Sequence, residues 1–168
     1  MSKRQTKEQE RAKYAWERIE DVQQFAKELA QKEEVKQRKA GKPIEEAQKK
    51  GADKARSFEN DYGSQARGLP ALIQVNGLGQ TLAYLLSKGK NDSEKPHQKL
   101  YAHLAKWVKG EMKWNDDTEL MQKLTHCSST HYRRATTEAM ALLVWLRRFT
   151  EARLIKEDVQ EGSNGAAT

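Results

Sequence analysis

Apolar residues recur at helical spacing from near the start of the chain. Between Thr6 and Lys39 there is no proline or glycine, and residues that favour helices dominate. A 4-3-4-3 spacing places five apolar residues of this range on one helix face: Ala15, Ile19, Val22, Ala26 and Leu29. Beyond Leu29 the stripe gives way to Gln, Lys, Glu and Arg. The pattern predicts a long N-terminal helix whose second half has little apolar surface to bury.

Glycine and proline indicate where this helix stops and the next ones begin. Gly41-Lys42-Pro43 predicts the end of the first helix and the start of a second, from Pro43 to about Ala66. Gly68-Leu69-Pro70 predicts another break, followed by a short helix through Leu72 and Ile73 that ends at Asn76-Gly77. A further helix is expected from Leu78 to Ser87, closed by Gly89.

The C-terminal half predicts further helices separated by polar loops. Residues 88–95 have the composition of an exposed loop, in which Asp92 or Ser93 caps the next helix and Pro96 lies in its first turn. Asp116 and Glu119 have the spacing of a capping box in front of Leu120. The last helix is expected from Ser129 to about Lys156, apolar on nearly all sides and therefore central or covered by a partner.

No segment shows the period of two that is typical of strands. We therefore expect an all-α fold, a compact bundle of about six or seven helices with a long N-terminal helical arm. Residues 1–160 form a single domain in this interpretation, and residues 161–168 form a disordered tail.

Composition and charge narrow the class of partner. Of the 168 residues, 36% are hydrophobic and 33% are charged, and the net charge of +7 favours a polyanionic partner such as RNA or DNA. No apolar run approaches the roughly 20 residues that span a bilayer, so we expect no membrane segment. The single cysteine, Cys127, excludes an internal disulfide and fits a cytoplasmic protein.

Two short motifs resemble ligand sites but lack essential parts. Gly77-Leu78-Gly79 does not follow a strand and has neither the third glycine of a dinucleotide site nor the Lys of a P-loop, so we interpret it as a helix connection. His126, Cys127 and His131 lie close in sequence, but a zinc site needs three or four ligands and no further cysteine exists. The sequence predicts no cofactor and no metal.

A ribonuclease is the enzyme class that a basic protein suggests first. Metal-dependent cleavage needs gathered carboxylates, and Asp116, Asp117 and Glu119 cluster, although they also mark a helix start. Metal-free cleavage needs an acid–base group such as histidine, and the four histidines have no recognisable arrangement. We assign no catalytic residue and keep a metal-dependent ribonuclease as the less favoured alternative.

Arginine pairs on the last predicted helix form the main candidate binding site. Arg133-Arg134 and Arg147-Arg148 are 14 residues apart. Arg133 and Arg147 therefore project within about 40° of one another and about 21 Å apart along the axis. Such a stripe suits RNA backbone phosphates, and a merely solvated face is the equal alternative. Lys88 and Lys90 are weaker candidates, and Met140 and Val144 are candidates for a partner interface.

Three blocks of sequence, taken in order, resemble one protein family. They are residues 9–17 (QERAKYAWE), 69–85 (LPALIQVNGLGQTLAYL) and 132–152 (YRRATTEAMALLVWLRRFTEA). The chain is similar to the small helical subunit of the Cmr module of type III-B CRISPR–Cas systems, over residues 9–29 and 56–155. Residues 30–55 look like an extension of the helical arm beyond the usual length of that family.

The resemblance implies a non-catalytic helical bundle that works in antiviral defence. It implies several copies stacked into a short filament, with crRNA, target RNA and the backbone and large Cmr subunits as partners. Arg133 and Arg148 match basic positions of the motif. The other matching residues are mostly packing types, and we interpret them as fold determinants: Leu69, Pro70, Gly77, Leu78, Gln80, Glu138, Trp145 and Phe149. A basic protein–protein adaptor that does not touch RNA is the competing hypothesis.

Overall fold

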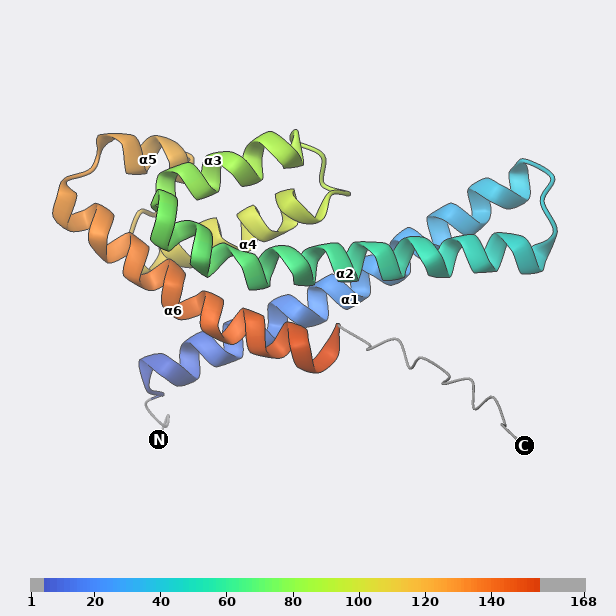
Figure 1. Ribbon diagram of the computed structural model, residues 1–168, viewed down its shortest axis with the longest axis horizontal. Helices are drawn as coiled ribbons and strands as arrows, with labels where there is room; N and C mark the ends of the chain where they lie inside the picture. Colours follow the sequence, from blue (N-terminus) through green and yellow to red (C-terminus); the bar gives the residue numbers. More distant parts are fainter. Residues whose placement is uncertain (1–4, 155–168) are drawn as a thin grey trace, which may run out of the picture.

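The computed structural model describes residues 5–154, and all regular structure in this range is helical (Figure 1). The six helices are α1 (Lys7–Lys39), α2 (Ile44–Asn76), α3 (Leu78–Gly89), α4 (Pro96–Glu111), α5 (Leu120–His126) and α6 (Ser129–Arg153). The expected all-α fold of six or seven helices is thus confirmed. The predicted continuation of the last helix to Lys156 and the predicted tail at 161–168 lie outside the described residues.

The two longest helices organise the bundle. Helices α1 and α2 run antiparallel, α6 packs against both of them, and α4 packs against α2, α3 and α6 (Figure 1). The predicted stripe of α1 forms part of the core, since all five of its residues from Ala15 to Leu29 are buried. From α6 the core receives Leu142, Leu143 and Leu146, none of which is exposed.

Part of the α1–α2 hairpin projects beyond the bundle as a helical arm, which we define as residues 30–55 (Figure 1). Small residues let its two helices approach closely. A Cβ atom added to the buried Gly51 would lie 2.5 Å from the carbonyl oxygen of Ala30, which is well inside van der Waals contact. The larger apolar residues of the arm, Val35 and Ile44, are about half exposed. Backbone proximity, more than side-chain burial, holds the arm together.

Gly51→Ala is expected to destabilise the protein by about 1–2 kcal/mol, because the added methyl group forces two backbones apart. Gly68→Ala is the matched control in the same helix, where an added Cβ meets nothing within 4 Å. It should stabilise α2 by about 0.5–1 kcal/mol, the ordinary helix preference of alanine over glycine. Urea unfolding of both variants checks this pair, and a stabilising Gly51→Ala would contradict the close approach.

The predicted helix break at Gly68-Leu69-Pro70 is wrong, because α2 continues through all three residues to Asn76. Pro70 removes one backbone hydrogen bond, which costs about 3 kcal/mol in a helix interior. The same turns bury Ala66, Leu69 and Ile73 on one face. Burial of each large apolar side chain contributes about 1.5–3 kcal/mol, so packing outweighs the local preference of proline.

The predicted caps of two helices are also wrong in detail. Pro96 does begin α4, but the N-cap is Lys95, and Asp92 instead accepts the backbone N–H of Glu94 at 2.9 Å. Helix α5 begins at Leu120, after Glu119, and no side chain caps it. The carboxylates expected to form a capping box make other contacts, which are described with the candidate site. A capping box does occur, between Thr6 and Gln9 at the start of α1.

Candidate nucleic-acid interface on α6

The start of α6 is held in place by two side chains. Ser128 caps the helix by accepting the backbone N–H of His131. Tyr132, one turn further on, accepts the N–H of Gly79 through its hydroxyl at 2.8 Å and so joins α6 to the first turn of α3. A Cβ on Gly79 would lie 3.2 Å from that hydroxyl. The Gly77-Leu78-Gly79 motif therefore allows the start of α3 to approach α6 closely.

All four candidate arginines of α6 are exposed, but their charges are not equally available. The Nε of Arg147 is 3.1 Å from the carboxylate of Glu151, and an Nη of Arg134 donates to the carbonyl oxygen of Glu111. The guanidinium groups of Arg133 and Arg148 have no ion-pair or hydrogen-bond partner within residues 5–154. These two therefore offer the least compensated charge on the helix.

The spacing of the free arginines differs slightly from that of the predicted stripe. Arg133 and Arg148 are separated by about 22 Å along the axis and by about 60° around it. Both project from the outer side of α6, since the buried residues Leu142, Leu143 and Leu146 occupy the other side. The stripe thus spans about four turns of one exposed helix face.

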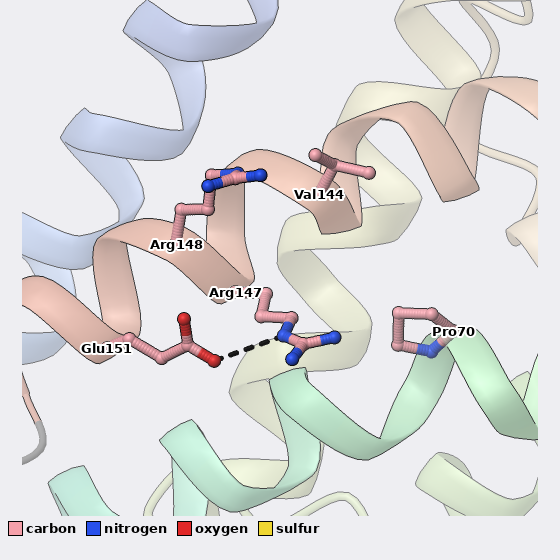
Figure 2. Close-up of a pocket in the computed structure, with 5 residues that line it drawn as sticks. All are labelled: Pro70, Val144, Arg147, Arg148 and Glu151. Carbon is pink, nitrogen blue, oxygen red and sulfur yellow. Dashed lines mark hydrogen bonds and ion pairs between the residues drawn. The ribbon is translucent and has the colours of Figure 1, made fainter.

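A shallow groove between α6 and α2 lies at the C-terminal end of this stripe (Figure 2). It has a volume of about 360 Å³ and is lined by Pro70, Val144, Arg147, Arg148 and Glu151. Figure 2 shows Arg147 directed toward α2 and paired with Glu151, whereas Arg148 points away from α2. Because Arg147 is paired with Glu151, Arg148 is the lining cation without a partner among the described residues.

The two candidate interface residues of α6 differ in exposure. Val144 is 51% exposed in the wall of the groove, whereas Met140 packs against the core. An apolar side chain between Arg133 and Arg148 interrupts the basic face. The face therefore combines guanidinium groups with a small apolar surface.

The structure does not bring the lysine candidates to this face. Lys88 and Lys90 are exposed, and Lys90 ends α3 in a left-handed conformation with a φ of 51°. The opposite end of α3 is the one that contacts α6 through Tyr132, and a helix of 12 residues is about 18 Å long. A basic residue that the sequence did not indicate, Lys113, lies nearer to Arg134, two residues after the Glu111 carbonyl that Arg134 contacts.

Two of the three carboxylates considered for a nuclease site, those of Asp116 and Glu119, have structural partners. Asp116 pairs with Lys123 and accepts the N–H of Thr118, and these contacts lower its pKa to about 2. Glu119 accepts the hydroxyl hydrogen of Tyr101 at 2.5 Å. These contacts tie the α4–α5 loop to both of its helices.

The histidines and the cysteine considered for a metal site contact residues that are close to them in sequence. The Nδ1 of His131 is 3.2 Å from the hydroxyl of Ser128, and Cys127 contacts the carbonyl of Leu124. Within residues 5–154, no group of three or more histidine, cysteine or acidic side chains could hold a metal ion. None of the described helices is long and apolar enough to cross a membrane.

Comparison with known proteins gives two matches. The family described as CRISPR-associated protein (Cas_Cmr5) matches residues 32–153, which include most of the arm and all of α3 to α6. A protein of Thermus thermophilus, the CRISPR system Cmr subunit Cmr5, is 35% identical over 97 residues. That alignment covers 58% of this chain and 77% of the relative.

Proposed function

The chain belongs to the Cas_Cmr5 family of CRISPR-associated proteins, and from this premise we propose that it is a non-catalytic small subunit of a type III-B CRISPR–Cas ribonucleoprotein effector complex. In this role, several copies stack into a minor filament beside the subunits that carry the crRNA. The filament supports the binding of crRNA and target RNA in the cytoplasm. Its protein partners are the backbone and large subunits of the Cmr module.

The observation that carries the RNA-binding part is the uncompensated charge of Arg133 and Arg148. Both guanidinium groups lie on one exposed helix face and lack partners among the described residues. A separation of about 22 Å lets them contact different phosphates of one RNA strand. Contacts of this kind are independent of base sequence and sensitive to salt, which suits a subunit that must accept any guide.

Arg133→Glu combined with Arg148→Glu is expected to weaken the binding of single-stranded RNA at least about 10-fold at low salt, because two attractive charges become repulsive. The slope of log K against log salt concentration should also become shallower by about 1.4, which corresponds to two lost phosphate contacts on a single strand. Fluorescence anisotropy with a labelled RNA of mixed sequence, at several salt concentrations, measures both quantities.

The control is Lys13→Glu combined with Lys27→Glu, which changes the net charge equally. These two lysines are exposed on a different helix, α1. The control should keep most of the affinity, and circular dichroism should show equal helicity for all three proteins. Equal losses in both double variants would show that net charge alone acts, and the α6 face would lose its role.

A protein–protein adaptor is the second candidate function, and the exposure of Val144 within the basic face favours it. In that case the arginines serve acidic surfaces of Cmr subunits, and the isolated chain retains no RNA. If the isolated wild-type protein binds no RNA and is still incorporated into the Cmr complex, the adaptor is supported.

A further inference from the structure

One tryptophan of α1 is fixed in orientation although it is exposed. Trp16 is 41% exposed, and it lies where α6 packs across α1 (Figure 1). Its Nε1 donates to a carboxylate oxygen of Glu20 at 2.9 Å, and the guanidinium group of Arg153 lies over its ring, 4.3 Å from the ring centre. These contacts hold a large aromatic ring at the surface, where it buries little of its area.

Two aromatic residues of α6 adjoin this ring. Phe149 contacts Trp16 in an edge-to-face arrangement with ring centres 5.3 Å apart, and Trp145 lies 5.6 Å from Phe149. The Nε1 of Trp145 donates to the carboxylate of Glu8 on α1 at 2.9 Å. We define the aromatic platform as Trp16, Trp145 and Phe149. Because its rings are already held by contacts between two helices, the platform needs little ordering when a ligand binds.

The open side of Trp16 is the side that α6 does not cover. Arg153 and Phe149 both belong to α6 and lie one turn apart, so together they cover the indole from the α6 side. The exposed two-fifths of Trp16 therefore lies on its remaining side. An exposed indole is flat and apolar, which suits contact with another flat ring.

Positive charge without a partner lies beside the aromatic platform. Arg148 directly precedes Phe149, and its guanidinium group has no ion-pair or hydrogen-bond partner within residues 5–154. The charge of Arg153 is balanced by Glu20, 3.6 Å away. Arg148 projects within about 60° of Trp145, one turn earlier on the same helix. A ligand on the platform therefore meets a free guanidinium group.

A single strand of RNA matches both parts of this surface. One of its bases can stack on an aromatic ring, while a phosphate beside that base contacts the cation. Every base has a π-face, so stacking of this kind does not depend on base sequence. In a duplex the neighbouring bases cover these faces. The chemistry of the platform therefore suits unpaired RNA.

We propose that an unpaired RNA base stacks on the exposed indole of Trp16 while Arg148 contacts a neighbouring phosphate. This inference rests on the proposed function, in which α6 binds RNA phosphates, and it names the form of RNA that the site takes, a single strand with free base faces. It also gives the exposed ring a function, namely contact with bases of any identity.

Removal of the ring separates stacking from charge. Trp16→Leu is expected to weaken the binding of a labelled single-stranded RNA of mixed sequence about 5- to 100-fold. Binding of a strand of the same length without bases, and of an RNA duplex, should not change. The slope of log K against log salt concentration should also stay the same, because no phosphate contact is lost. Fluorescence anisotropy with the three labelled probes, at several salt concentrations, measures these quantities.

Three further variants are the controls. Trp16→Tyr keeps an aromatic ring and should retain most of the affinity for the single strand. Tyr84→Leu removes a half-buried ring from α3 and should bind like the wild type. Lys13→Glu with Lys27→Glu changes charge but no ring, so its ratio of affinities for the strands with and without bases should stay that of the wild type. Circular dichroism should show equal helicity, and Trp16→Met, with its flexible side chain, replaces Trp16→Leu if leucine disturbs α1.

Several outcomes would contradict base stacking on Trp16. Unchanged binding of the single strand by Trp16→Leu would overturn the stacking and leave the phosphate contacts of α6 in place. Equal losses for the strands with and without bases would overturn it as well, because they would indicate a distorted α6. A Trp16→Leu protein that keeps its RNA affinity but no longer enters the Cmr complex would assign the platform to a protein partner. A wild type that binds neither strand would instead overturn the RNA-binding function on which the stacking depends.

Discussion

Lowering the pH from 7 to 5 is expected to reduce the free energy of unfolding by about 2 kcal/mol, chiefly through one buried histidine. His103 of α4 is 6% exposed, and its Nδ1 is 2.8 Å from the hydroxyl of Tyr62. Burial lowers the pKa of His103 to about 3, and the positive charges of Arg18, Lys99 and Lys106 act in the same direction. The folded protein therefore keeps this imidazole neutral.

The direction of the pH effect follows from the two pKa values. The unfolded chain binds a proton at His103 below the ordinary histidine pKa of 6.5, whereas the folded chain does not until about pH 3. The contribution of the neutral His103 to the free energy of unfolding is therefore present in full above pH 6.5. Below pH 6.5 this contribution falls by about 1.4 kcal/mol per pH unit. Glu8, Glu33 and Glu46 have lowered pKa values and lose their contribution only below about pH 4.5, so the interval from 6.5 to 5 isolates the histidine effect.

Urea unfolding at pH 7, 6 and 5 measures this slope, and His103→Asn is the informative variant. An asparagine amide oxygen can still accept the hydroxyl of Tyr62 but does not titrate. The variant should be less stable at pH 7, because the side chain is smaller, and should keep only the smaller pH dependence that the lowered pKa of His97 contributes. The exposed His131→Asn should keep the wild-type slope. An equal slope in His103→Asn would assign the effect to another group, with His97 the first to examine because burial also lowers its pKa.

The sequence predicts the elements of this fold well where a stripe is regular. The five predicted residues of α1 are all buried, because their spacing alone defines one helix face. The break predicted at Pro70 failed for the opposite reason. Proline and glycine are local signals, and the burial of Ala66, Leu69 and Ile73 against other helices is not visible in local sequence.

In the candidate site, too, some features can be predicted from the local sequence and others depend on the fold. Helical periodicity correctly places the four arginines of α6 on the surface, and the Arg147–Glu151 pair could have been read from their spacing of four. The contact of Arg134 with Glu111, 23 residues away, could not, so only the fold shows that Arg133 and not Arg134 has the free charge at the start of the helix. The end of α2 and the start of α3 need both sources, since the absence of charged residues from 68 to 87 is visible in the sequence but the exposure of Val75 is not.

Arg11→Met is expected to cost about 2 kcal/mol, and Arg11→Met with Glu138→Met is expected to recover most of that loss. Two bonds of 3.0 and 3.1 Å join an Nη of Arg11 to both carboxylate oxygens of Glu138, so that α1 is tied to α6. Both side chains are only 13% exposed. Removing the arginine leaves the largely shielded carboxylate of Glu138 without its cation, whereas replacing both residues leaves two apolar side chains in contact.

A double-mutant cycle of unfolding free energies isolates the coupling between these two residues. The exposed pair of Lys42, which precedes α2, and Glu46 in the first turn of α2, 3.1 Å apart, is the control and should give about 0.2–1 kcal/mol. Because the Arg11 pair is shielded from solvent, its coupling should persist in 1 M salt, whereas that of the control should vanish. Additive effects at Arg11 and Glu138 would mean that the two helices are held by apolar packing alone. Glu138, which we interpreted from the sequence as a packing position, would then need only an apolar side chain.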